Sequence, residues 1–349
     1  MTEKEFQKLL DEVHRAVPGL EFQTAPSFER ENYIAKNELV FPYDVVLSDG
    51  VLYIDSEEEQ EILEINGIPT DDLINAMKKV VVATNNQRFE FLVTEEFKLH
   101  YYEIYGSTEN FIIKVKTDGQ TKELNAKGIK YGERTMTTLL WGWGLRDSML
   151  DYTYGYESGY SFSRIVLKTF DAFSNFDLVM DDMQEKLARD NPDVLVIDLR
   201  HCNISSPEAV KLFYSKFNDM QKPFFVAASN SELVGEVAGE NIFNGKKIFV
   251  ITDASMNSLV NQLVIKFREL GFVTIGGAPI SSGTIGYNNR GSGVFDNTKI
   301  RYIYMKDRAD IAMIEEYPNG VAPHVFDENV KFKSRQVKFF KDLFDSQCQ

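Results

Sequence analysis

Polar residues follow three continuous apolar runs of the chain, at residues 198–203, 252–258 and 276–283. Each apolar run has the length of a strand, and in open α/β sheets ligands bind at the carboxyl ends of the strands. The second polar run leads into a predicted helix. A serine at a helix N-terminus lies beside backbone N–H groups and the positive end of the helix dipole. That setting suits a nucleophile with an oxyanion hole.

Ser255 and Ser258 are the serines at that helix start. Each has a second interpretation, because serine is a preferred N-cap residue and a cap is the commoner role at such a position. Asp198 also has two interpretations, since a carboxylate at a strand end more often pairs with a cation, here Arg200, than acts as a catalytic acid. The residue types therefore indicate a region for chemistry and leave the reaction open.

The elements that position these residues follow from the spacing of apolar side chains. Beyond about residue 160, continuous apolar strands alternate with helices, which favours a largely parallel sheet covered on both faces. The predicted strands are 162–169, 194–199, 223–228, 247–252, 272–277 and 300–305, and the predicted helices are 176–189, 207–218, 258–270 and 328–344.

The first part of the chain has a different pattern, which mixes helices with hairpins. The predicted helices are 2–17 and 88–105, and the predicted Asp-Gly hairpins are 44–54 and 111–124. Asn66-Gly67 turns the chain ahead of a short helix that Thr70 is expected to cap. The inward residues of that helix are Leu73, Ile74 and Met77.

The length of 349 residues, at roughly 150 residues per domain, predicts about two domains. We expect an N-terminal helical segment, a β-rich module, a loop-rich join and an α/β core. Their expected bounds are 1–40, 41–130, 131–160 and 161–345.

The composition excludes several function classes. Lys and Arg number 38 against 53 Asp and Glu, for a net charge of −15, which argues against nucleic acid and against anionic membranes as partners. No apolar run approaches the ~18 residues of a membrane span, and the N-terminus carries no secretory signal pattern. We expect Cys202 and Cys348 to be free thiols. The chain has neither metal-ligand spacing nor a Gly-rich phosphate loop, so neither a metal nor a cofactor is expected.

Five segments in order resemble the tail-specific (carboxy-terminal processing) family of serine peptidases, particularly bacterial members without a fully standard PDZ module. They are Glu61-ILEINGIPTDDLI, Val194-LVIDLR, Ile248-FVITDASMNSLVNQLV, Val273-TIGGAPISSGTIGY and Gly320-VAPH. The third segment resembles the strand, turn and helix that present the catalytic serine. By alignment of the helix start, the family's nucleophile falls on Ser258, with Ser255 as the second choice.

The resemblance implies a crotonase-like (ClpP-like) sheet-and-helix core with a smaller β-rich, PDZ-like N-terminal module. It implies hydrolysis of peptide bonds in peptides or unfolded proteins, often near exposed C-termini. The family is largely exported, whereas this chain shows no signal in its numbering. The oligomeric state is not indicated.

The site elements depart from the family's pattern. The loop at 278–283 lacks the family's lysine base, and the family's early histidine element is not visible. The glycine-rich loop after the "IDLR" strand is replaced by His201-Cys202-Asn203-Ile204-Ser205. His201 is the best candidate for the base, ahead of His100 and His324. The candidates for the oxyanion hole and cleft are Leu259, Asn203, Ile204 and Gly277.

Three hypotheses remain open. The first is an active serine peptidase that uses Ser258 and His201. The second is a catalytically inactive homologue that binds extended or C-terminal peptides by strand addition to a sheet edge. The third is a different small-molecule enzyme on the same fold that uses Cys202 with His201.

Overall fold

The computed structural model describes most of the chain, and the account below is confined to these parts. The described residues are 5–6, 9–10, 12–13, 22–25, 27–81, 83, 86–131, 150–170, 176–204, 207–217, 227–228, 231–232, 246–254, 256, 258–280, 285–310 and 321–348.

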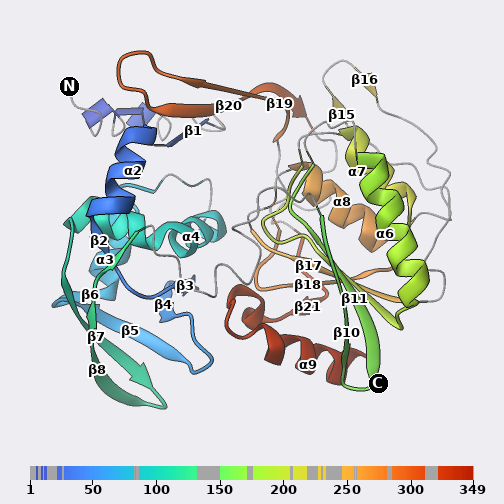
Figure 1. Ribbon diagram of the computed structural model, residues 1–349, viewed down its shortest axis with the longest axis horizontal. Helices are drawn as coiled ribbons and strands as arrows, with labels where there is room; N and C mark the ends of the chain where they lie inside the picture. The colour runs from blue at the N-terminus through green and yellow to red at the C-terminus, as the bar shows by residue number, and fades with distance from the viewer. Residues whose placement is uncertain are drawn as a thin grey trace. The chain divides into compact units, whose positions relative to one another are not determined.

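Two compact units make up the chain (Figure 1). The N-terminal unit comprises Met1–Gly144, Gly291–Met305 and Phe332–Arg335. The C-terminal unit comprises Leu145–Arg290, Lys306–Lys331 and Gln336–Gln349. Within the described part of the chain, no helix has the length and apolarity to cross a membrane.

The N-terminal unit is built on an antiparallel sheet in the order β3-β4-β5-β7-β8, with β6 paired to β5. These strands are β3 (Val45–Ser48), β4 (Val51–Ile54), β5 (Gln60–Ile65), β6 (Ile68–Pro69), β7 (Asn110–Thr117) and β8 (Gln120–Lys127). The helices are α2 (Phe28–Asn37), α3 (Thr70–Met77) and α4 (Asn86–Tyr105). Smaller pairings involve β1 (Phe22–Ala25), β2 (Leu39–Val40) and β9 (Ile129–Lys130). Strand β1 pairs with β20 (Arg301–Asp310), which pairs with β19 (Ile285–Val294), and residues 291–305 of this hairpin belong to the N-terminal unit.

Asp-Gly turns form both predicted hairpins of this unit. Asp49, Gly50, Asp118 and Gly119 all have positive φ, as two-residue hairpin turns require. The apolar residues of β7 alternate and are buried against α4 in one core cluster. The apolar side chains that alternate along β7 therefore pack in one core with the apolar face of α4.

Two predicted details of the helices are wrong. Thr70 is the first residue of α3 rather than its cap, because its hydroxyl donates to the Ile62 carbonyl and Pro69 stands at the cap position. The predicted helix 328–344 is broken into the 3₁₀ helix η2 (Glu328–Lys331) and α9 (Gln336–Gln347). Between them, the backbone N–H groups of Lys333 and Ser334 donate to the Asp55 carboxylate, so they are not available to continue a helix. Leu73, Ile74 and Met77 are buried as predicted.

The C-terminal unit contains a six-stranded sheet in the order β10-β11-β13-β17-β18-β21. The strands are β10 (Leu150–Glu157), β11 (Tyr160–Leu167), β13 (Val194–Asp198), β17 (Lys247–Thr252), β18 (Val273–Gly276) and β21 (Val325–Phe326). All neighbours pair in parallel except β10 with β11. Short strands β12 (Thr169–Phe170), β14 (Asn203–Ile204), β15 (Ala227–Ala228) and β16 (Ser231–Glu232) lie outside this sheet.

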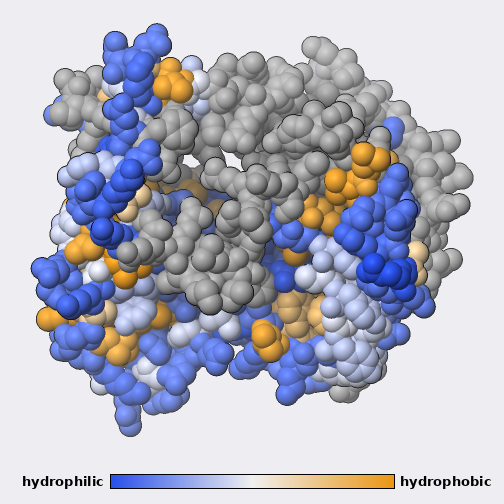
Figure 2. All heavy atoms as spheres, viewed as in Figure 1, coloured by the Kyte–Doolittle hydropathy of each residue, from blue (hydrophilic) through white to orange (hydrophobic). Residues whose placement is uncertain are grey.

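Helices cover both faces of this sheet. Side chains of alternate residues in β13 and β17 enter one core with α6 (Phe176–Asp190), α7 (Pro207–Ser215) and α8 (Ser258–Glu269). The remaining side chains of the same strands enter a second core with η2 and α9. The outward side of α6 carries mostly hydrophilic side chains (Figure 2). The predicted α/β core with a smaller β-rich N-terminal region is therefore confirmed.

A buried carboxylate connects the sheet to the layer of η2 and α9. Asp198 is 1% exposed, and its Oδ2 lies 2.5 Å from Arg164 Nη2 and 2.6 Å from Arg200 Nη2. Burial opposes its ionisation, but the two guanidinium groups hold the pKa of Asp198 well below its usual range. Arg200 also donates to the carbonyl of Val330 and to Oε1 of Gln336. The expected pairing of Asp198 with Arg200 is therefore confirmed, with Arg164 as a second partner.

Replacing Asp198 with Asn is expected to lower the free energy of unfolding by about 3–5 kcal/mol, because two largely buried guanidinium groups lose their counter-charge. Urea unfolding followed by circular dichroism measures this. The matched control is Asp182→Asn, since Asp182 pairs with Lys186 at the surface and its side chain is 58% exposed. The control is expected to change stability by less than about 1 kcal/mol. Equal small losses in both variants would contradict the role of the buried carboxylate.

His100 on α4 is expected to make the stability of the N-terminal unit depend on pH. Burial lowers the pKa of His100 from 6.5 to about 4, so the folded chain holds the neutral ring while the unfolded chain takes up a proton near pH 6.5. The stability that this ring contributes is therefore present above pH 6.5 and is lost as the pH falls towards 4. The loss is expected to reach about 3 kcal/mol at most. Urea unfolding at pH 7 and pH 5 measures this loss, and the free energy of unfolding of His100→Gln should differ less between the two pH values than that of the wild type. An equal difference in both proteins would contradict the lowered pKa of His100.

Candidate functional site

A tight turn at the end of β13 determines where His201 lies. The N–H of Leu199 donates to the Ile251 carbonyl, so pairing with β17 continues one residue past the strand. The N–H of Cys202 then donates back to the Leu199 carbonyl, which makes Arg200 and His201 the central residues of a β-turn. His201 has φ of 59°, in the left-handed region that glycine and asparagine adopt more readily than other residues.

Two carboxylates anchor this turn from different strands. The N–H of Arg200 donates to Asp198 Oδ1 at 3.2 Å, and the N–H of His201 donates to Asp253 Oδ2 at 2.9 Å. The same Asp253 oxygen lies 3.5 Å from Nε2 of His201, and the two side chains are 22% and 16% exposed. That separation is longer than an ordinary hydrogen bond, and the contact is an ion pair only when the imidazole is protonated. Asp253 therefore holds the backbone of His201 and lies beside its ring.

Helix α8 begins at Ser258, six residues beyond the end of β17 at Thr252. The predicted nucleophile is thus the first residue of the helix, as expected, although its side chain lies outside the described residues, as does all of Ser255. Leu259 follows it with a side chain that is 3% exposed and packed in the core. The backbone N–H of Leu259 belongs to the first helical turn, where N–H groups have no acceptor within the helix.

Asn203 and Ile204 form a strand where a loop was expected. They make up β14, which pairs in parallel with Thr169 and Phe170 of β12 and lies against α7 and α8. A β-branched isoleucine favours this extended conformation. The segment therefore lies next to α8 but has strand pairing where the family's pattern has a glycine-rich loop.

Gly277 lies just after β18, at the same sheet edge as Asp253, because Gly276 of β18 pairs with Thr252 of β17. A Cβ atom at Gly277 would come within 2.8 Å of the Lys331 side chain. The close approach of Lys331 is sufficient to explain a glycine here. Whether its backbone also serves an oxyanion hole stays a prediction.

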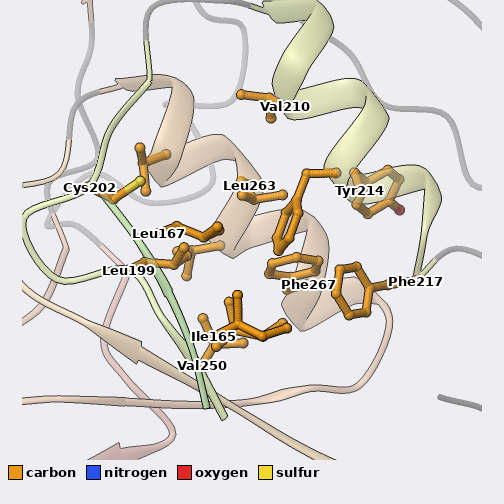
Figure 3. Close-up of a cluster of buried hydrophobic side chains, with 14 of the residues drawn as sticks. Ile165, Leu167, Leu199, Cys202, Val210, Tyr214, Phe217, Val250, Leu263 and Phe267 are labelled. Carbon is orange, nitrogen blue, oxygen red and sulfur yellow. The ribbon is translucent and has the colours of Figure 1, made fainter. Parts of the chain in front are cut away.

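Cys202 is a core residue. Its side chain is 1% exposed and lies in the apolar cluster that also contains Leu167 and Leu199 (Figure 3). Burial, together with the charges of Asp253 and Asp198, raises the pKa of the Cys202 thiol well above its usual value. A protonated, buried thiol is a poor nucleophile, which argues against an enzyme based on Cys202 and His201.

The other candidate bases lie elsewhere. His100 is on α4 of the N-terminal unit. The Nδ1 atom of His324 accepts the backbone N–H of Thr274 at 3.0 Å, and burial lowers the pKa of His324. His324 thus holds the segment before β21 to β18. Of the described histidines His100, His201 and His324, only His201 lies at the polar strand ends that precede α8.

Asp253 was not predicted as a site residue from the sequence, although it lies in the segment that precedes Ser258. The available signal was an acidic residue directly after one apolar strand and a histidine directly after another. That signal becomes informative only once β13 and β17 are known to be neighbours. Among the described residues, no group of three or more His, Cys, Asp and Glu could hold a metal ion.

The left-handed backbone of His201 can be tested by comparing His201→Gly with His201→Ala. Both variants lose the contact between the ring and Asp253, so their difference reports the backbone alone. We expect His201→Gly to be more stable by about 1 kcal/mol in urea unfolding, because glycine adopts positive φ without a steric cost. If the alanine variant were the more stable, the turn would not have this conformation.

Comparisons with known proteins support the fold. No family model matches the chain, and no curated protein matches it. Mature CPAF complexed with lactacystin is similar over 100% of this chain and 89% of that chain, with a TM-score of 0.59 and 13% identity. Mature CPAF gives a TM-score of 0.57 with 12% identity over 100% of this chain and 89% of that chain. A photosystem II D1 C-terminal processing protease gives a TM-score of 0.41 with 11% identity, over 94% of this chain and 84% of that chain. This TM-score is too low to carry an argument. The chain therefore has the fold of mature CPAF.

Proposed function

We propose that this protein is a serine-type peptidase of the tail-specific kind that acts on peptides or unfolded proteins. Ser258 is the proposed nucleophile and His201 the proposed general base. The observation that carries the proposal is the contact of His201 with Asp253 at neighbouring strand ends, immediately before the helix that begins at Ser258. A base that is itself oriented by a third group, near a nucleophile at a helix N-terminus, is the usual arrangement for activating a serine.

The proposed chemistry assigns a task to each of these groups. His201 accepts the proton of the Ser258 hydroxyl as the serine oxygen attacks the peptide carbonyl carbon. The proton then passes to the departing amine, and water releases the acyl group with His201 again as the base. The N–H groups in the first turn of α8, including that of Leu259, are the proposed donors to the oxyanion, with Gly277 as a further candidate.

The positions of the resembling segments in the fold support this proposal. Glu61-ILEINGIPTDDLI falls on β5, β6 and α3, and Val194-LVIDLR falls on β13 and the turn after it. Ile248-FVITDASMNSLVNQLV falls on β17, its connection and α8. The segment that resembles the presentation of a catalytic serine thus coincides with a strand end, a short connection and a helix start. The β-rich N-terminal unit is the proposed PDZ-like module.

One observation favours the second candidate, a catalytically inactive homologue that binds extended or C-terminal peptides. Asn203 and Ile204 pair with β12, which commits part of the segment that would supply oxyanion donors to strand pairing. Loss of one such donor typically lowers kcat by about 10²–10³. Such a protein would bind chains by strand addition without cleaving them.

A fluorophosphonate probe distinguishes these candidates. We expect it to label the folded wild-type protein and not Ser258→Ala, while Ser255→Ala labels at the wild-type rate. His201→Gly should label about 10²–10⁴ times more slowly. Lactacystin, the compound bound in the similar CPAF structure, is a second ligand to test against the same variants.

The other outcomes are equally informative. Labelling that disappears in Ser255→Ala but persists in Ser258→Ala would move the nucleophile to Ser255. Folded wild-type protein that is never labelled, yet binds C-terminal peptides in calorimetry, would replace the peptidase with the peptide-binding homologue.

A further inference from the structure

We propose that Asp253 is a positioning residue that orients the His201 imidazole and keeps its proton on Nε2. This inference rests on the proposed function, in which His201 is the base for Ser258. It adds a third member to that pair, from the strand next to the one that carries His201.

The pairing register brings Asp253 to His201. Strands β13 and β17 run in parallel, with Asp198 opposite Ile251. His201 lies three residues past Asp198, and Asp253 lies two residues past Ile251. The two residues therefore leave the sheet at the same edge and on adjacent strands. The hydrogen bond from the His201 N–H to Asp253 Oδ2 then fixes the carboxylate against the turn.

Asp253 is the carboxylate at this edge that contacts the imidazole. Asp198 is also close in sequence, but its charge is taken up by Arg164 and Arg200, both within 2.6 Å of its Oδ2. The Asp253 oxygen lies 3.5 Å from Nε2 of His201. A carboxylate at that nitrogen favours the tautomer with the proton on Nε2.

This tautomer leaves the lone pair on Nδ1, which is the nitrogen that must accept the Ser258 proton. Nδ1 is buried, whereas the His201 side chain as a whole is 22% exposed. When the ring takes the proton it becomes an imidazolium, and the Asp253 carboxylate stabilises that charge without itself accepting a proton. The positive φ of His201 determines the direction in which the turn presents the ring.

The test replaces Asp253 with Asn, which removes the charge but keeps a side-chain oxygen to accept the His201 N–H. We expect the maximal rate of fluorophosphonate labelling to fall by about 10²–10⁴-fold, with little change in the probe concentration for half-maximal rate. The matched control is Asp193→Asn at the opposite end of β13, where Asp193 accepts hydrogen bonds from Ser161. The control should label at the wild-type rate.

Nitrogen-15 NMR of the histidine rings provides a readout that a purely structural role would not move. The chain has four histidines, and the His201 signals are those missing from His201→Gly. In the wild type we expect a neutral ring with its proton on Nε2, and in Asp253→Asn a loss of that preference, because an uncharged amide oxygen attracts the Nε2 proton less than a carboxylate does.

Each result decides something. A wild-type His201 with its proton on Nδ1 would overturn the inference, whether or not the variant folds. Labelling of Asp253→Asn at the wild-type rate would also overturn it and would leave the proposed function intact. A wild-type protein that the probe does not label would overturn the proposed function and, with it, any catalytic role for Asp253.

Discussion

The buried carboxylate of Asp198 is the constraint on which the rest of the C-terminal unit depends. An ionised group without exposure to water is tolerated only when it is paired and hydrogen-bonded, and Arg164 and Arg200 supply both conditions. Arg200 contacts Asp198, Val330 and Gln336 from the turn after β13. The same interaction therefore joins the sheet to the layer of η2 and α9 and determines the backbone that carries His201.

Two aspartates at neighbouring strand ends thus have different tasks because their surroundings differ. The charge of Asp198 is balanced by two guanidinium groups, and this pairing holds the sheet to η2 and α9. Asp253 contacts the turn through its hydrogen bond to the His201 N–H and contacts the ring at Nε2.

Much of the core could be predicted because burial on both faces makes a strand continuously apolar, as in Val194–Asp198 and Lys247–Thr252. The start of α8 at Ser258 was predictable because the continuous apolar pattern of a buried strand ends shortly before it and the spacing of a helix begins there. The break between η2 and α9 was not, because Asp55, which takes the N–H groups of Lys333 and Ser334, is distant in sequence. The contact of Asp253 with His201 could not be predicted either, since it depends on which strand lies beside β13.

The strand pairing of Asn203 and Ile204 bears on how fast such a site can work. With this segment in β14, the proposed donors to an oxyanion come mainly from the first turn of α8, where the helix dipole adds to the backbone N–H groups. In the proposed mechanism a histidine oriented by a carboxylate transfers the proton, but a smaller set of donors stabilises the tetrahedral intermediate less. The proposed site would then combine weak turnover with retention of bound peptide. The two proposed functions, a slow peptidase and a peptide-binding homologue, would therefore differ mainly in the number of N–H groups that face the developing charge.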